Sequence, residues 1–369
     1  MSKLLDNAKR VVVKIGSSLL VDPESGELRH DWLDSLIADV AALKARGKDV
    51  MIVSSGAVAL GRRDLALDRR RLKLDEKQAA AAVGQIRLAH AYQEALAAHG
   101  LAVAQLLMTI DDTEERRRYL NARATMDTLL RMGVVPVINE NDTVATAEIR
   151  FGDNDRLAAR VAVMAGADLL VLLSDIDGLY TADPAVDKTA EHIAEIGDIS
   201  VAIENMAGRA RDGSPGSGGM ITKIAAARIA VAGGCHMLIA SGRVRNPVGK
   251  ISAGARTTWF KALASPKAAR KKWISGMLQA SGALVIDAGA VAALRRGKSL
   301  LPAGVKAVNG MFERGDAVRI LDEDGGQIAR GLVAYGAADA SAIMGARSQD
   351  IEEILGFAGR DVMVHRDDL

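Results

Sequence analysis

Two lysines stand where they could bind an anion. Lys14 lies near the end of the apolar run 11–15, before Gly16, and Lys223 follows the small residues 217–219 near the start of a helical pattern. A lysine inside an apolar strand costs free energy unless its charge has a partner. Glycine turns and helix N-termini let backbone N–H groups approach a phosphate. The sequence therefore predicts an anion-binding role for Lys14, and for Lys223 either this role or an exposed position in a first helical turn.

Small and polar residues also follow the other apolar runs, at 54–57, 139–142, 152–155, 174–178 and 214–220. Asp155 could hold the two lysines by charge pairing, or it could serve in the first turn of a helix. Asp142 could cap a turn and Asn154 a helix. Residue type and position alone leave these alternatives open.

Short apolar runs alternate with longer helical patterns over the first two-thirds of the chain. The runs lack the polar alternation of half-exposed strands, which predicts buried strands at 11–15, 50–53, 101–108, 134–138, 169–173 and 236–240. Helical spacing predicts helices at 30–46, 76–98, 114–131 and 220–232. Strands separated by helices run mostly parallel, so the expected fold class is α/β, a three-layer αβα sandwich. Ligands bind beyond the carboxyl ends of such strands, which is where the polar loops lie.

The pattern changes after Gly242. From residue 275 onward, turn signals separate short strands at 283–286, 317–321 and 331–335, which predicts a small, mainly β second domain. Lys and Arg number 6 and Asp and Glu none over residues 256–273. A run of one charge predicts a solvated linker, or here a helix at the domain junction. We therefore expect a first domain at 1–255, a basic linker at 256–274 and a second domain at 275–369.

Composition excludes several classes of protein. The 369 residues are 49% hydrophobic and 25% charged, as in folded globular chains. The apolar stretches are too short for a membrane span, and no signal-peptide pattern opens the chain, so we expect neither membrane attachment nor export. Cys235 is the only cysteine, which fits a cytoplasmic location.

Several motifs follow one another along the chain: KIGSS at 14–18, SSGA at 54–57, VPVINEND at 135–142, TAEI at 146–149, FGDND at 151–155, GLYTADP at 178–184 and SGGMITK at 217–223. In type and order they resemble the glutamate 5-kinase family of the amino acid kinase superfamily. LLPAGVK at 300–306 and the ending VHRDD at 364–368 resemble the PUA domain that many members carry. The resemblance implies an amino acid kinase-like catalytic domain followed by a PUA-like domain. It also implies ATP-dependent phosphorylation of the L-glutamate side-chain carboxylate to L-glutamyl 5-phosphate, the first step of proline biosynthesis.

The resemblance also assigns roles to single residues. It makes Lys14, Lys223 and Asp155 catalytic. It places Ser55, Asp142 and Asn154 at the substrate, where Asp142 can pair with the ammonium while Ser55 and Asn154 donate to carboxylate oxygens. The ATP-binding positions are Lys14, Ser174, Asp175, Ser217, Gly218, Gly219, Met220, Ile221, Thr222 and Lys223. Mg²⁺ is expected on the ATP phosphates, so no metal-binding residue is predicted.

Three other kinds of function fit parts of the sequence. The nearest is a related superfamily member acting on aspartate, acetylglutamate, carbamate or a nucleoside monophosphate. Another is an RNA-binding protein, because PUA domains elsewhere contact RNA; 10 basic against 13 acidic residues over 274–369 argue against specific nucleic-acid binding. A third is a regulatory or architectural domain without a ligand. If the kinase function holds, we expect free proline as feedback inhibitor and a homo-oligomer, either dimer or tetramer.

Overall fold

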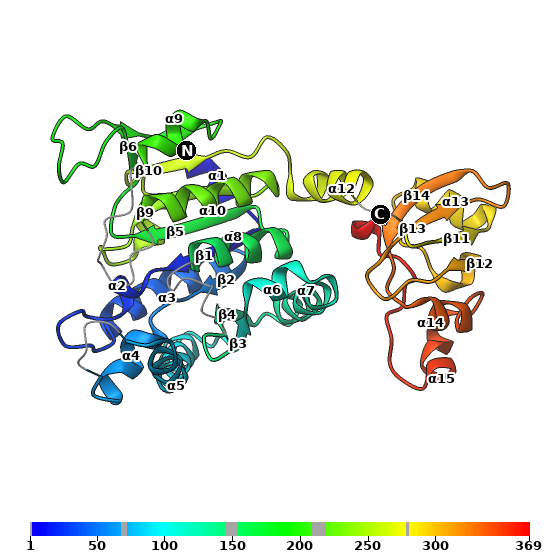
Figure 1. The fold of residues 1–369 in the computed structure, drawn as a ribbon, viewed down its shortest axis with the longest axis horizontal. Coiled ribbons are helices and arrows are strands. Elements are labelled where there is room, and N and C mark those ends of the chain that lie inside the picture. The colour runs from blue at the N-terminus through cyan, green and yellow to red at the C-terminus, as the bar shows by residue number, and fades with distance from the viewer. Residues whose placement is uncertain (1, 68–71, 145–153, 208–218, 278–279) are drawn as a thin grey trace. The chain divides into compact units, whose positions relative to one another are not determined.

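The computed structural model describes residues 2–67, 72–144, 154–207, 219–277 and 280–369. It forms two compact units, one of Met1–Glu114 with Asn121–Pro266 and one of Glu115–Leu120 with Lys267–Leu369. The first unit contains an eight-stranded sheet in the order β3-β4-β2-β1-β5-β9-β10-β8 (Figure 1). Its strands are β1 (Arg10–Ile15), β2 (Asp49–Val53), β3 (Val103–Met108), β4 (Val135–Glu140), β5 (Leu169–Ser174), β8 (Glu195–Ile196), β9 (His236–Ser241) and β10 (Thr257–Phe260).

The six predicted strands are confirmed, and they run parallel to one another. The sheet is mostly parallel as expected, because β10 alone among these pairings runs antiparallel to its neighbour β9. The helices that lie wholly or mostly in this unit are α1 (Ser2–Asn7), α2 (Ser17–Leu20), α3 (His30–Ala45), α4 (Ala57–Asp64), α5 (Leu74–Ala97), α6 (Ile110–Glu114), α7 (Arg116–Arg131), α8 (Asn154–Ala165), α9 (Val201–Met206), α10 (Met220–Ala232) and α11 (Pro247–Ser252). β6 (Leu179–Tyr180) and β7 (His192–Ile193) form a separate antiparallel pair of two residues each.

Side-chain alternation along β1 shows why the sheet has two helical layers. Val11, Val13 and Ile15 point into a core that also contains Leu36 of α3 and Leu88 of α5. Residues with the opposite parity, including Lys14, point to the other face. Helices α8 and α10 pack on each other and against the strands of that face (Figure 1). The three-layer sandwich predicted from the sequence is therefore confirmed.

The first unit extends beyond the end expected at residue 255. Strand β10 pairs with β9 and buries Trp259 and Phe260 completely or almost so. The units divide between Pro266 and Lys267, and helix α12 (Pro266–Met277) starts at this boundary. The linker expected at 256–274 is thus wrong in its first part, where charges at Arg256 and Lys261 flank an uncharged core strand. Four of the six basic residues, Lys267, Arg270, Lys271 and Lys272, lie on α12.

The second unit has its own sheet and core. Its strands, in the order β12-β11-β13-β14, are β11 (Gly282–Ile286), β12 (Val305–Gly310), β13 (Ala317–Leu321) and β14 (Gln327–Leu332). Three helices pack with them, α13 (Ala288–Arg295), α14 (Ala337–Ala342) and α15 (Ile351–Leu355). The mainly β second domain is confirmed. The strand expected at 331–335 instead ends at Leu332, and β12 was not predicted. Across the described ranges of both units, no helix has the length and apolarity needed to cross a membrane.

Candidate active site

Three charged side chains meet at the carboxyl end of β1. Lys14 comes from β1, Asp155 from the first turn of α8 and Lys223 from the first turn of α10. Lys14 Nζ pairs with Asp155 Oδ1, and Lys223 Nζ lies 3.1 Å from Asp155 Oδ2. Asp155 is fully buried, and each lysine is 7% exposed. The fold therefore brings together the three residues that the resemblance makes catalytic.

The protonation state of Asp155 follows from these contacts. Burial acts to raise the pKa of its carboxyl group, but the charges on Lys14 and Lys223 outweigh burial and lower the pKa to about 2. Asp155 is therefore ionised at neutral pH. Among these three side chains, the two ammonium groups outnumber the one carboxylate. Fixed positive charge away from bulk water stabilises an anion strongly, so this cluster is suited to phosphate oxygens.

The first turn of α10 adds a hydroxyl group to the same carboxylate. Thr222 Oγ1 lies 3.0 Å from Asp155 Oδ2 and 2.9 Å from the Gly219 carbonyl oxygen. Met220 and Ile221 occupy the same turn, with Ile221 exposed. These predicted ATP-binding residues therefore lie next to the lysine cluster. Ser217 and Gly218, also predicted to bind ATP, lie outside the described residues.

The remaining predicted nucleotide residues lie at the end of the neighbouring strand. Leu173 of β5 is in register with Ile15 of β1, so Ser174 and Asp175 follow at the same edge of the sheet. Ser174 is buried, and its hydroxyl donates to Asp175 Oδ1 at 3.0 Å. The Asp175 carboxylate is exposed and lies 4.0 Å from Arg243 Nη2. A ligand can therefore reach this carboxylate from solvent.

Asn154, directly before Asp155, contacts polar groups at the ends of β2 and β4. Its Nδ2 lies 3.1 Å from the Ser54 carbonyl oxygen, 2.7 Å from Ser55 Oγ and 3.2 Å from Asn139 Oδ1. Its Oδ1 is buried and accepts no hydrogen bond from the part of the chain that the structure describes. The sequence led us to expect Asn154 as a donor to a substrate carboxylate. In the structure its N–H groups are already used, and the group it offers to a ligand is an acceptor.

The turn that follows β2 requires a glycine. Gly56 has φ +111°, a conformation that side chains with a Cβ rarely adopt, and an added Cβ would lie 3.3 Å from Val21 Cγ2. This turn leads from β2 into α4 and leaves the Ser55 hydroxyl beside Asn154. Because Ser55 Oγ accepts from Asn154, its own O–H remains able to donate to a ligand.

Asp142 lies two residues beyond β4 and is half-buried. Burial raises the pKa of its carboxyl group to about 6. Within the described ranges no hydrogen bond or ion pair joins Asp142 to Ser55 or Asn154, so the structure does not bring these three predicted substrate residues into one contact. The motif residues 146–153 that follow lie outside the described residues. A carboxylate whose charge is penalised by burial gains from a cationic ligand.

Helix α5 supplies two residues that the sequence analysis missed. Gln85 Oε1 accepts a hydrogen bond from Asn139 Nδ2 at 2.7 Å, and the Tyr92 hydroxyl lies 3.0 Å from Ser54 Oγ. Tyr92 is fully buried, which raises the pKa of its phenol. A seven-residue spacing places Gln85 and Tyr92 on one face of the helix. That spacing was the only available signal, and it is also the spacing of ordinary core residues.

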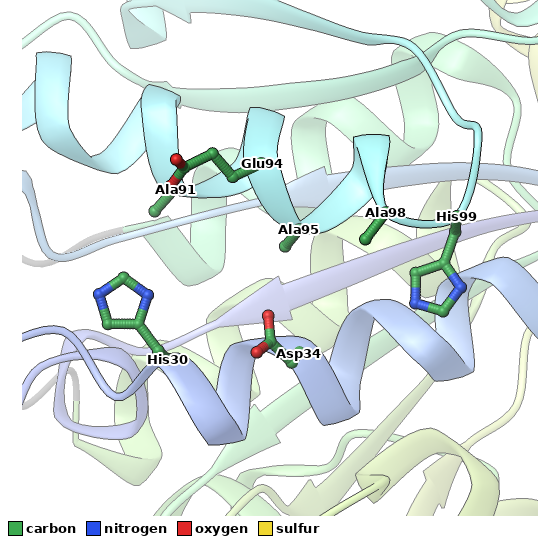
Figure 2. A pocket seen from close by; sticks show the side chains of 7 residues that line it. All are labelled: His30, Asp34, Ala91, Glu94, Ala95, Ala98 and His99. Carbon is green, nitrogen blue, oxygen red and sulfur yellow. The ribbon is translucent and has the colours of Figure 1, made fainter.

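A separate cavity lies between α3 and α5 (Figure 2). It has a volume of about 450 Å³ and is lined by His30, Asp34, Ala91, Glu94, Ala95, Ala98 and His99. The side chains of Asp34 and Glu94 are exposed; Asp34 points from α3 toward α5, and Glu94 lies along α5 itself (Figure 2). Two carboxylates would repel ATP and an acidic substrate. This groove therefore does not suit the ligands that fit the lysine cluster.

Comparison with known proteins agrees with this geometry. Residues 9–241 match the model of the amino acid kinase family, and residues 282–355 match that of the PUA domain. Since the first match covers more than half of the chain, it defines the class.

Relatives in this class are similar over nearly their whole length. A glutamate 5-kinase from Paramagnetospirillum magneticum is 61% identical, over 98% of this chain and 97% of its own. One from Bradyrhizobium sp. is 60% identical, over 100% of this chain and 97% of its own. One from Rhodopseudomonas palustris is also 60% identical, over 99% of this chain and 97% of its own. The chain belongs to the amino acid kinase family and, within it, to the glutamate 5-kinases.

Proposed function

We propose that this chain transfers the γ-phosphoryl group of ATP to the side-chain carboxylate of L-glutamate, as the first step of proline biosynthesis. The observation that carries the proposal is the buried cluster of Lys14, Asp155 and Lys223, which lies directly beside Asn154 and its free acceptor oxygen. The cluster suits phosphate, and the acceptor suits an amino acid ammonium. The names of the relatives supply the substrate.

The reaction forms a bond between a glutamate side-chain oxygen and the γ-phosphorus and breaks the bond from that phosphorus to the bridging oxygen, which leaves with ADP. The attacking carboxylate has an ordinary pKa of about 4.3, so it is ionised at pH 7 and needs no general base. The obstacle is repulsion between anions. Lys14 and Lys223 offset the charge on the transferred group, and Asp155 holds both ammonium groups in place.

The amino acid end of the substrate meets groups of the opposite kind. Asn154 Oδ1 accepts a hydrogen bond from the substrate ammonium, and Asp142 supplies a negative charge for it. The Ser55 hydroxyl donates to the α-carboxylate. The groups that bind the substrate ammonium lie on the Asn154 side of the site, and the lysines that bind phosphate lie on the Asp155 side. This difference sets the direction in which glutamate binds.

We propose that Mg²⁺ reaches the site on ATP. Asp155 Oδ2 accepts hydrogen bonds from Lys223 and Thr222, and Oδ1 forms an ion pair with Lys14, so these cations stand where a metal ion would have to bind this carboxylate. When bound, Mg²⁺ neutralises phosphate charge.

The test is a hydroxylamine trap. Purified protein with Mg-ATP and L-glutamate should yield γ-glutamyl hydroxamate, because hydroxylamine captures an acyl phosphate. A coupled assay of ADP release, which also detects products that hydroxylamine does not trap, compares L-aspartate, carbamate, acetylglutamate and nucleoside monophosphates as alternative substrates. A catalytic efficiency with any of them equal to that with L-glutamate would refute the assignment and favour a related member of the superfamily.

Proline shares the α-carboxylate and a protonated nitrogen with glutamate, so it should act as a feedback inhibitor at the same groups and compete with glutamate.

A homo-oligomer is supported by large apolar side chains exposed on the first unit, Ile86 at 74% and Met132 at 72%, and light scattering would measure its size. A cytoplasmic location follows from the use of ATP and free glutamate.

A further inference from the structure

Gln85 lies on helix α5 and ends a chain of three side-chain amides that reaches the candidate substrate site. Asn154 Nδ2 contacts Asn139 Oδ1, and Asn139 Nδ2 contacts Gln85 Oε1. Asn139 is 2% exposed and Asn154 is 7% exposed. The kinase mechanism proposed above uses Asn154 but assigns nothing to Gln85.

The direction of every hydrogen bond in this chain is fixed from one end. The Ser54 carbonyl oxygen can only accept, so the Asn154 atom 3.1 Å from it must be Nδ2. Asn139 must then present its oxygen to Asn154 and its nitrogen to α5. A residue at position 85 that accepts a hydrogen bond satisfies this nitrogen, whereas a donor or an apolar side chain leaves it unpaired. Gln85 Oε1 meets the requirement at 2.7 Å.

Helix α5 is held firmly enough to transmit this constraint. It crosses α4 at Gly61 and Gly84, where an added Cβ would lie 1.8 Å from the Ala80 carbonyl oxygen or 1.9 Å from that of Ala57. Backbone therefore packs on backbone beside Gln85. Seven residues further along the same face of α5, the Tyr92 hydroxyl forms a hydrogen bond with Ser54 Oγ. The helix thus contacts the ends of both strands, β2 and β4, that carry the substrate loops.

We propose that Gln85 is a positioning residue for the glutamate site. Its side-chain carbonyl accepts the hydrogen bond that Asn139 must donate, and so stabilises the orientation of Asn139 in which the N–H groups of Asn154 stay on the protein and its Oδ1 remains available to the substrate ammonium. The inference rests on the proposed function for the identity of the substrate. The polarity of the amide chain itself does not depend on it.

Replacing Gln85 by methionine tests the acceptor while nearly preserving shape. Gln85→Met leaves the buried Asn139 Nδ2 unpaired, and we expect the KM for glutamate to rise about tenfold, with the KM for ATP and kcat changed less than about threefold. Gln85→Glu restores an acceptor and should return the glutamate KM to within about threefold of wild type. The control is Gln93→Met, at an exposed position of the same helix, which should change none of these constants.

A double variant tests the contact between Gln85 and Asn139 without substrate. In Asn139→Asp, a flipped Gln85 can donate to the new carboxylate, so each of Gln85→Glu and Asn139→Asp retains one hydrogen bond. Together they place two acceptors at 2.7 Å, so the loss in melting temperature of the double variant should exceed the sum of the single losses.

Two results would overturn the inference. One is a loss in melting temperature of the double variant equal to the sum of the single losses, and the other is an equal effect of Gln85→Met and Gln85→Glu on the glutamate KM. Absence of hydroxamate from the wild-type protein would instead refute the proposed function, while the melting-temperature cycle would still test the contact between Gln85 and Asn139.

Discussion

Asp155→Asn removes the one negative charge between two buried lysines and replaces one of the two acceptor oxygens by a donor nitrogen. Asparagine has the same size, so the packing at the start of α8 is retained. The pKa of Asp155 is lowered from 3.8 to about 2. At 1.36 kcal/mol for each unit, the ionised carboxylate contributes about 2 kcal/mol to the free energy of unfolding at pH 7.

The pH dependence of this contribution has a definite sign. Because the folded-state pKa lies below the unfolded value, the stabilisation is complete above about pH 4 and is lost as pH falls toward 2. Urea denaturation at pH 7 should show the variant less stable by about 2 kcal/mol, with a smaller difference below pH 4. Asp49→Asn, which removes the partly exposed partner of Arg10, is the control and should cost less than about 1 kcal/mol.

The catalytic effect should differ from the effect on binding. Without Asp155 the two ammonium groups repel each other and leave their positions, although their positive charge toward ATP is not reduced. We expect kcat to fall about 100-fold or more, while the KM for ATP does not rise. The hydroxamate assay at saturating glutamate measures both constants. An unchanged kcat, or a raised ATP KM with normal kcat, would refute the role of Asp155 as the group that positions the lysines.

Other predictions concern both halves of the site. Lys14→Ala and Lys223→Ala should each lower kcat about 100-fold in the hydroxamate assay, as for loss of a transition-state charge partner, and a tenfold rise in KM alone would contradict this. Since the pKa of Asp142 is about 6 and its carboxylate must be ionised to bind an ammonium, the glutamate KM should be about fourfold higher at pH 5.5 than at pH 7.5. Asp142→Asn should abolish that difference; a pH profile unaltered by the substitution would exclude Asp142. Gly84→Ala should destabilise the chain by about 1–3 kcal/mol in urea denaturation, because its Cβ meets the Ala57 carbonyl oxygen, whereas Gly197→Ala, with open space around it, should not. A chain that ends at Pro266 contains the complete eight-stranded sheet and should fold and retain phosphoryl transfer, and a folded but inactive truncation would show that the second unit takes part in catalysis.

The central strands could be predicted because burial on both faces leaves continuous apolar runs in the sequence. β10 could not, because four uncharged residues between Arg256 and Lys261 are too short a run to outweigh the basic residues around them. Only pairing with β9 across the sheet shows that Trp259 and Phe260 belong to the core. β8 has two residues and leaves no local pattern at all.

The candidate site divides in the same way. Lys14, Asp155 and Lys223 lie in short motifs at strand ends and helix starts, so local sequence made them candidates and the family resemblance assigned their roles. Gln85 was missed because its partner Asn139 is 54 residues away and the contact exists only after α5 packs on the sheet. The sequence also could not predict which atom of the Asn154 amide faces a ligand. Its free oxygen follows from the position of the Ser54 carbonyl group, which accepts a hydrogen bond from Asn154 Nδ2.

Two neighbouring residues at the start of α8 join the two halves of the site. In the proposed mechanism, Asn154 presents an acceptor to the amino acid end of the substrate, and Asp155 organises the two lysines at the phosphate end. Adjacent residues are separated by a fixed distance of about 3.8 Å between Cα atoms, so the two halves cannot move apart independently. The ammonium and the attacking carboxylate of one substrate must fit this fixed arrangement. Because the carboxylate is already ionised, placing it correctly against the γ-phosphorus is most of what the protein must achieve.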